Sequence, residues 1–102
     1  MCENIVSKAS SNGRNLDLSN LQLDSLPIQI LELKDSLEFL NLSGNRLSSF
    51  PDWFGDMKKL RTLFVANNLF EEFPRVLKKL NNLFMLSFRN NSLTTIHDDS
   101  LR

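Results

Sequence analysis

The sequence is poor in the residues that bind metals or form disulfides. Its 102 residues include one cysteine, Cys2, and one histidine, His97. A Cys/His zinc cluster or an internal disulfide needs more of these residues than the chain has. Zinc-stabilised folds and disulfide-stapled secreted scaffolds are therefore excluded, and we expect no metal and no cofactor.

The chain also lacks an excess of one charge and a long hydrophobic run near its start. Its 12 basic and 12 acidic residues cancel, so no overall field attracts it to nucleic acid or to an anionic membrane. Residues 1–12 are polar, and the apolar run of Ile5 and Val6 is too short for a signal peptide or a membrane span. We expect a cytoplasmic protein with no nucleic-acid partner and no membrane insertion.

Catalytic motifs are missing as well. The sequence contains no glycine-rich phosphate-binding loop, no zinc-protease motif and no kinase catalytic motif. His97 lies beside Asp98 and Asp99, but acid–base catalysis also needs a positioned reactive group in a walled pocket. We therefore expect no enzymatic activity within these residues.

Leucine and asparagine are abundant, with 20 and 12 copies beside only three glycines and three prolines. This bias indicates a repeated motif. Asn45, Asn68 and Asn91 are 23 residues apart, and their surroundings align without a gap. The aligned positions are Leu37, Leu40, Leu42, Asn45, Leu47, Phe50 and Pro51, then Leu60, Leu63, Val65, Asn68, Phe70, Phe73 and Pro74, then Leu83, Leu86, Phe88, Asn91, Leu93, Ile96 and His97.

A looser copy precedes these three at a spacing of 24 residues, with Leu21 in place of the asparagine. Its matching positions are Leu16, Leu18, Leu23, Leu26 and Pro27. We divide the chain into a polar tail, 1–12, and a repeat domain, 13–102. The repeats are 13–36, 37–59, 60–82 and 83–102, the last incomplete. Because terminal repeats are atypical, the first copy is expected to act as a cap.

The pattern L-x-x-L-x-L-x-x-N-x-L-x-x-[LF]-P resembles the leucine-rich repeat, whose period is about 20 to 29 residues. Within that class, residues 60–77 and the fourth copy look like the N-terminal repeats of bacterial proteins that carry a downstream protein-kinase domain. Other intracellular arrays, including Ras-binding and polarity scaffolds, share the Leu-Pro ending. The resemblance implies a solenoid that recognises other molecules.

Local physics agrees with an α/β solenoid. The alternation of residues 40–43 predicts a strand with one buried face, which must pair with the strand of the next copy and so build a short parallel sheet on the concave face. A buried asparagine amide after each strand can satisfy backbone groups in the turn. Residues 52–59 and 75–82 have apolar side chains at helical spacing, which predicts helical or 3₁₀ return segments on the convex face. Residues 28–36 predict the most regular of these helices.

The last repeat stops within its return segment. Adding 23 to Leu83 places the next first leucine at 106, beyond Arg102. The favoured interpretation is a fragment of a longer array. Alternatively, a partner or a second copy covers the edge, and a homodimer would bury Phe88, Leu93, Ile96 and Leu101.

Residues that flank the strand leucines are expected to point out of the concave face. Most are small or polar, but Phe39, Phe64 and Met85 predict an oblique apolar band across three strands, since parallel strands stack about 4.8 Å apart. Grouped exposed aromatics are typical of interaction surfaces. Alternatively, flanking segments cover part of this band. The predicted partner-binding set is Phe39, Asn41, Arg61, Phe64, Leu69, Phe84, Met85, Ser87 and Arg89.

Arg46, Arg61 and Arg89 offer positive charge near the band, and Asp17 and Glu38 offer negative charge toward the N-terminal end. One alternative is that these residues are ordinary solvated surface charges; the other is a charge gradient along the face. Such a gradient would orient a partner more than hold it. The sequence therefore predicts a protein-interaction module, of the scaffold or signalling kind, that binds a partner protein through its concave face. One alternative is the recognition arm of a larger enzyme, such as a protein kinase whose catalytic domain follows residue 102. The other is the structural homodimer.

Overall fold

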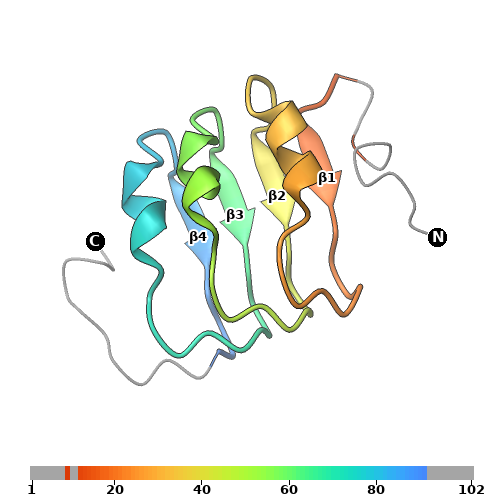
Figure 1. Cartoon of the computed structure of the whole chain (residues 1–102), viewed down its shortest axis with the longest axis vertical. Coiled ribbons are helices and arrows are strands. Elements are labelled where there is room, and N and C mark those ends of the chain that lie inside the picture. Colours follow the sequence, from red (N-terminus) through yellow and green to blue (C-terminus); the bar gives the residue numbers. More distant parts are fainter. Residues whose placement is uncertain (1–8, 10–11, 92–102) are drawn as a thin grey trace.

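Four short strands pair in sequence order into one parallel sheet, which forms one layer of the computed structural model (Figure 1). The structure describes residue 9 and residues 12–91. The strands are β1 (Asn15–Asp17), β2 (Phe39–Asn41), β3 (Thr62–Phe64) and β4 (Met85–Ser87). The second layer contains three 3₁₀ helices, η2 (Ile28–Leu33), η3 (Asp52–Asp56) and η4 (Arg75–Lys79).

The strand register repeats from one copy to the next. Leu16, Leu40, Leu63 and Leu86 are aligned across the four strands. The ladder continues past the strand ends, because the amide of Leu42 donates to the carbonyl of Phe64 at 2.7 Å. The parallel sheet that the alternating pattern predicted is confirmed.

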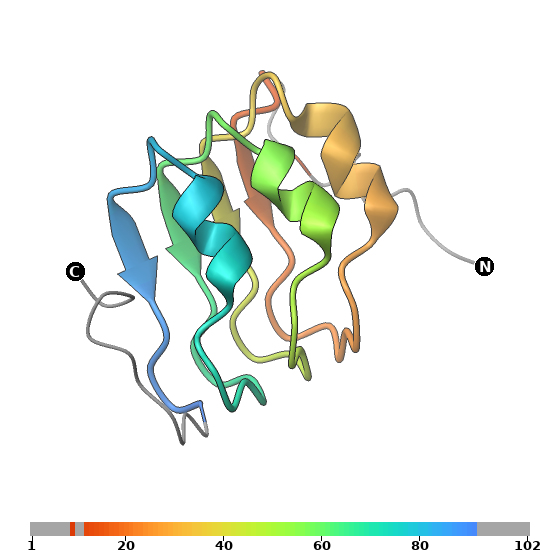
Figure 2. The same ribbon diagram turned by 60° about the vertical axis from the view of Figure 1, so that its left-hand side comes forward.

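The return segments all lie on one side of the sheet, as two views show (Figure 2). Each follows a proline: Pro27, Pro51 and Pro74 occupy the positions before η2, η3 and η4. Their hydrogen bonds span three residues, as in the 3.1 Å bond from the amide of Met57 to the carbonyl of Phe54. Segments of five or six residues are too short for a stable α-helix, so the tighter 3₁₀ turn forms instead.

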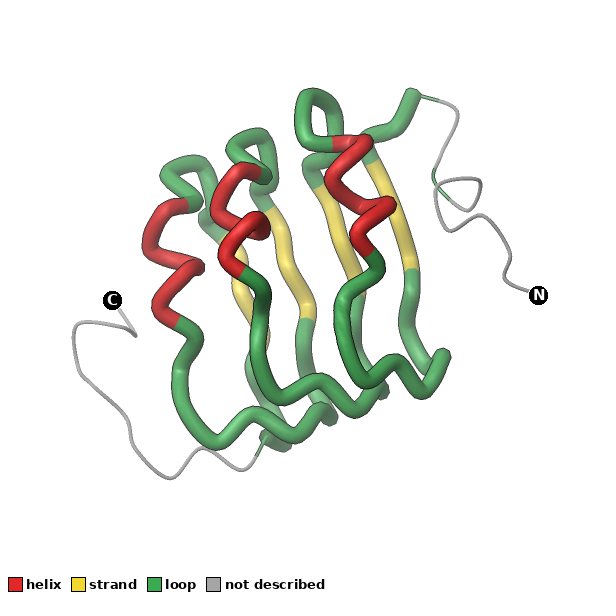
Figure 3. Tube along the Cα trace, viewed as in Figure 1, coloured by secondary structure: helices red, strands yellow, loops and turns green. Residues whose placement is uncertain are grey.

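This outcome confirms the predicted helical or 3₁₀ return segments. The segment expected to be the most regular helix, residues 28–36, forms the longest of the three, with six residues in η2, but it is also a 3₁₀ helix. Figure 3 shows that loops connect each strand to the following 3₁₀ helix and each helix to the next strand.

The core lies between the sheet and the 3₁₀ layer. Leu40 and Leu63 point inward from the strands, while Phe54 and Met57 meet them from the η3 side, and all four are fully buried. The last repeat is less enclosed, because Leu83, Leu86 and Phe88 are only half-buried. The other residues of the predicted homodimer contact, Leu93, Ile96 and Leu101, lie outside the described residues, as do Cys2 and His97.

An aromatic cluster joins the second, third and fourth repeats. Phe50 stacks on Phe54 with ring centroids 4.6 Å apart and lies 5.2 Å from Phe70. Phe70 in turn meets Phe88 edge-on at 5.2 Å. Trp53 is half-buried and presents its edge to Phe54 at 6.2 Å, so it packs against the core. These rings therefore connect each of these repeats to its neighbour.

Candidate functional site

Asparagine side chains join each repeat to the one before it. Asn68 is buried, and its Oδ1 accepts a hydrogen bond from the amide of Leu47 at 3.0 Å. Its Nδ2 donates to the carbonyl of Leu42 in the preceding repeat at 3.0 Å and to that of Val65 in its own repeat at 3.2 Å. One side chain therefore satisfies backbone groups that neither the sheet nor the 3₁₀ layer reaches.

The other two asparagines make the same kind of bridge. Oδ1 of Asn45 accepts from the amides of Leu21 and Leu23 at 3.0 and 2.9 Å. Oδ1 of Asn91 accepts from the amide of Phe70 at 3.1 Å, and its Nδ2 donates to the carbonyl of Val65 at 2.8 Å. The structure places the asparagine row in the turn where the spacing predicted it. In the first repeat, the position holds Leu21, whose side chain is exposed.

A second repeating position was missed by the sequence reasoning. In each repeat, the residue just before the position of the buried asparagine (Leu21 in the first repeat) has a positive φ. These residues are Asn20, Gly44, Asn67 and Asn90, with φ of 57°, 75°, 58° and 59°. Asparagine and glycine are the residues that most readily adopt this left-handed conformation. The signal was present as an asparagine or glycine at a fixed step before the buried asparagine.

The open face of the sheet, opposite the 3₁₀ layer, carries the alternate residues of each strand. They form two rows. The first row is Asn15, Phe39, Thr62 and Met85, and the second is Asp17, Asn41, Phe64 and Ser87. The rings of Phe39 and Phe64 meet edge-to-face with centroids 5.4 Å apart, and both are half-buried. We call these two residues the aromatic pair.

The apolar band differs in shape from the predicted oblique line. Phe39 and Met85 lie in the same row, with Thr62 between them, whereas Phe64 lies in the other row. The band therefore bends, because the apolar residue changes strand position between the second and third repeats. Met85 continues it with half of its side chain exposed.

Two residues of the predicted partner-binding set, Phe84 and Leu69, lie at opposite ends of the strands. Phe84 precedes β4, is 74% exposed and lies under the guanidinium of Arg61, 5.4 Å from the ring centroid. Leu69 follows the turn after β3 and is also exposed. The predicted set therefore divides: Phe84 and Arg61 border the open face at the strand starts, and Leu69 lies beyond the strand ends.

Polar residues of the open face are organised by short turns. The Asp17 carboxylate accepts from the amide of Ser19 at 2.9 Å, and the Asn41 amide oxygen accepts from that of Ser43 at 3.0 Å. Hydrogen bonds from the hydroxyl and the amide of Ser19 lower the pKa of Asp17, against a small opposing effect of burial. Asp17 is thus fixed in place and ionised at neutral pH.

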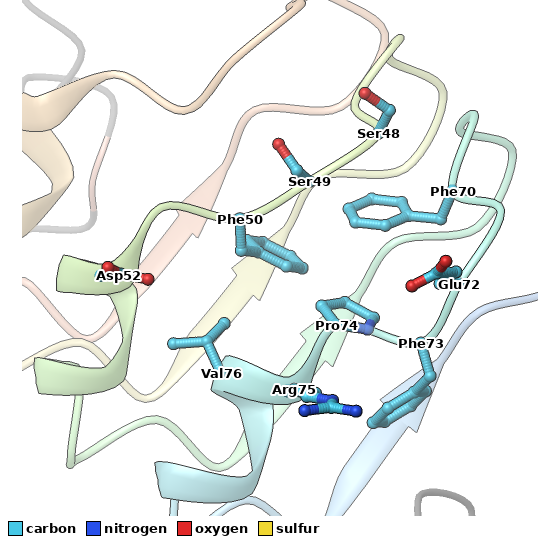
Figure 4. Close-up of a pocket in the computed structure, with 10 residues that line it drawn as sticks. All are labelled: Ser48, Ser49, Phe50, Asp52, Phe70, Glu72, Phe73, Pro74, Arg75 and Val76. Carbon is cyan, nitrogen blue, oxygen red and sulfur yellow. The ribbon is translucent and has the colours of Figure 1, made fainter. Parts of the chain in front are cut away.

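A cleft of about 290 Å³ lies away from the open face, between the second and third repeats (Figure 4). Aromatic rings form much of its wall, and carboxylate, hydroxyl and guanidinium groups lie around them. Its lining residues are Ser48, Ser49, Phe50, Asp52, Phe70, Glu72, Phe73, Pro74, Arg75 and Val76. The repeat pattern gave no signal for this cleft, because it forms where the loops of two copies pass side by side.

Two kinds of site are absent from the described part of the chain. Among residues 9 and 12–91, no three histidine, cysteine, aspartate or glutamate side chains gather where they could hold a metal ion. None of the helices in that part combines the length and the hydropathy needed to cross a membrane.

Comparison with known proteins identifies the repeat. A family model described as "Leucine Rich repeats (2 copies)" matches residues 35–79, which include two of the observed strands and η3. The chain belongs to the leucine-rich repeat family. The α/β solenoid of this family is the architecture described above.

Several leucine-rich repeat relatives match most of this chain. Osteomodulin of Bos taurus is 34% identical over 79 residues, which are 76% of this chain and 18% of that protein. Adenylate cyclase of Podospora anserina is 38% identical over 84 residues, 82% of this chain and 4% of that protein. Probable inactive serine/threonine-protein kinase roco10 of Dictyostelium discoideum is 31% identical over 88 residues, 81% of this chain and 3% of that protein. The chain thus spans less than a fifth of the length of each of these three.

Proposed function

We propose that this leucine-rich repeat binds a partner protein through the open face of its sheet. Leucine-rich repeats are in general protein-interaction modules, and the open face is where this one exposes apolar side chains on a regular support. The observation that carries the proposal is the aromatic pair, Phe39 and Phe64, continued by the half-exposed Met85.

The arrangement has the properties of a binding surface. Aromatic side chains supply much of the energy of protein interfaces and carry little conformational entropy to lose. The edge-to-face contact holds both rings before any partner arrives. A surface that is already ordered loses less free energy on binding. The parallel sheet beneath, with its buried leucines, supplies that order.

A capture experiment tests the proposal. The immobilised chain, its Phe64→Ala variant and its Ile28→Ala variant are exposed to an extract of the source cells, and bound proteins are quantified by mass spectrometry. Ile28 is the matched control, because it is exposed by 54% on η2, in the layer opposite the open face. We expect Phe64→Ala to lower the capture of a specific partner at least about fivefold, as for loss of an anchor worth more than 1 kcal/mol. Equal capture by all three proteins would contradict the proposal.

A second candidate is the recognition arm of a larger enzyme, such as a protein kinase. Its support is that two relatives are named as an adenylate cyclase and a probable inactive protein kinase. The two candidates share the open face and differ in what is attached to it. Intact mass spectrometry of the native gene product tests the second candidate, since a mass near 11.8 kDa would exclude an attached catalytic domain.

A third candidate is a homodimer through the edge of β4. Its support is that Leu83, Leu86 and Phe88 are half-buried, whereas their counterparts in the second and third repeats are buried. A dimer would cover these side chains. Its apparent stability must then fall on dilution, so a thermal midpoint that does not change with protein concentration would exclude it.

We also propose a cytoplasmic location. The support is compositional. Secreted leucine-rich repeat proteins commonly have clustered cysteines that cap the ends of the repeat array, and this sequence has one cysteine. Subcellular fractionation with an antibody against the chain tests it, and recovery outside the cytoplasmic fraction would contradict it.

A further inference from the structure

We infer that the open face selects an extended partner segment with a fixed order of charge: a basic residue over β1, an apolar residue over the aromatic pair and an acidic residue over β4. This inference rests on the proposed function and adds the chemistry of the partner. It follows from where the structure places the charged groups around the apolar band.

The acidic end of the face is a single fixed carboxylate. Asp17 is exposed in the second row on β1, and its bond to the amide of Ser19 holds the carboxylate in place. The nearby Glu38 lies 3.9 Å from Arg14, so an opposite charge already compensates it. Within residues 9 and 12–91, Asp17 is in no ion pair and is free to meet a partner's cation.

The basic end lies across the sheet. Arg89 is exposed and follows β4 by two residues, which places it on the same face as Ser87 by alternation. The amide of Asn67 donates to the carbonyl of Arg89 at 2.8 Å, so the ladder extends to this residue and fixes its backbone. Arg61 lies at the opposite end of the strands, before β3 and against the exposed ring of Phe84, so it is not part of this basic end. Neither arginine forms an ion pair in the described part of the chain.

The spacing of these groups defines the length of the segment. Four parallel strands with neighbours about 4.8 Å apart place β1 roughly 14 Å from β4. An extended chain advances about 3.3 Å per residue, so about four residues cover that span. Alternate residues of an extended segment face the same side. The pattern that fits is therefore basic, any, apolar, any, acidic, read in either chain direction.

The middle position of this pattern falls over the aromatic pair. The second row places Phe64 on β3 and the first row places Phe39 on β2, so the meeting point of their rings lies between the two central strands. A side chain two residues from each charged end reaches that point. The apolar contact would supply most of the affinity, and the two charged ends would set the orientation.

A peptide library tests this inference. Random heptapeptides displayed on phage are selected against the chain and, in parallel, against Phe64→Ala. The informative peptides are those that the chain enriches and Phe64→Ala does not. We expect them to share an apolar central residue, with a basic residue two positions to one side and an acidic residue two positions to the other. Peptides that depend on Phe64 but have no such charge order would overturn the inference and leave the proposed function standing. Absence of any Phe64-dependent peptide would overturn both.

Matched variants measure each charged end. Asp17→Asn removes the carboxylate but keeps an acceptor for the Ser19 amide, as Asn41 does for Ser43. Arg89→Gln removes the opposite charge. We expect each variant to weaken a selected peptide about two- to fivefold, as for a partly exposed ion pair, measured by fluorescence polarisation.

The control for these variants is Asp56→Asn, which removes an exposed carboxylate at the end of η3, in the other layer. It should leave peptide affinity unchanged. A peptide with glutamine at its basic position should bind the chain and Asp17→Asn equally well. An equal loss for both peptides would show that Asp17 acts on the fold rather than on the partner's cation, and would overturn its assigned role.

Discussion

Each buried asparagine serves two repeats at once, which explains why a polar residue lies among leucines. A buried amide or carbonyl without a partner costs more free energy than a made hydrogen bond contributes. The amide of Asn68 has both donor and acceptor capacity, and the turn requires both. A leucine of similar size would fill the space but leave those backbone groups unpaired.

Replacing Asn68 with alanine should therefore lower the free energy of unfolding by about 1 to 3 kcal/mol, because the amide of Leu47 loses its partner. The measurement is urea denaturation followed by circular dichroism. Asn81→Ala is the control, since Asn81 lies exposed in the turn after η4. Equal midpoints for the two variants would contradict the bridging role of the asparagine row.

Stability should also depend on pH through Asp17. Its pKa in the folded state lies below the ordinary value because Ser19 hydrogen-bonds the ionised carboxylate. The unfolded state therefore takes up the proton first as the pH falls, so this contribution is complete above the unfolded pKa and disappears as the pH falls through the folded pKa.

We expect the stability of the chain, relative to Asp17→Asn, to be constant above about pH 5 and to decline from about pH 4 downward. Urea midpoints of both proteins across this range provide the measurement. A difference that rises with falling pH would contradict the assigned direction of the pKa shift.

At the scale of elements, the short 3₁₀ helices gain their stability from what they cover. Five or six residues cannot hold a helix in isolation, and the prolines before them set only where each begins. Phe54, Met57 and Leu77 supply the buried contacts to the sheet. The aromatic cluster then connects the loop of one repeat with that of the next.

Phe70 is the centre of this cluster and is fully buried, and Phe70→Ala should destabilise the fold by about 3 to 5 kcal/mol, because it leaves a cavity beside the rings of Phe50 and Phe88. Phe84→Ala is the matched control: the same substitution at a residue exposed by 74% should change stability by less than about 0.5 kcal/mol. Thermal and urea unfolding of both variants provide the test. A similar cost for the two would show that the cluster is not tightly packed.

The sequence predicted the elements well because their signals repeat with the period. The leucine phase gives the sheet and its buried face, and the asparagine spacing gives the turn. Other features depend on quantities that a pattern does not contain. The cation–π contact of Arg61 with Phe84 depends on side-chain rotamers, whereas the bend of the apolar band follows from the 23-residue period itself, because Thr62 rather than Phe64 shares the phase of Phe39 and Met85. The cleft beside Phe50 and Glu72 forms only when two loops pass each other.

At the scale of the whole molecule, each repeat contacts mainly its neighbours, so stability accumulates along the stack. The central strands have a neighbour on both sides and fully buried leucines, Leu40 and Leu63. Leu86, their counterpart on β4, is only half-buried. Enclosure therefore decreases from the second and third repeats toward the fourth.

Hydrogen exchange should follow this gradient. We expect the amides of residues 40–42 and 63–65 to exchange most slowly and those of residues 83–88 to exchange measurably faster, since less burial lowers the free energy of local opening. Exchange followed by mass spectrometry of peptic fragments resolves the segments. Uniform protection across all four strands would indicate that the stack opens only as one unit.

Those asparagine bonds that cross between repeats run in one direction along the chain, from each repeat back to its predecessor. The turn of each repeat therefore has its backbone amide satisfied by the asparagine of the following repeat. An inserted duplicate of 23 residues would bring the amide that the preceding copy needs and would offer its own backbone to the copy that follows. Such an array can lengthen by gene duplication without compensating substitutions. Each added unit widens the open face by one strand, about 4.8 Å, so evolution can adjust the reach of the surface in equal steps.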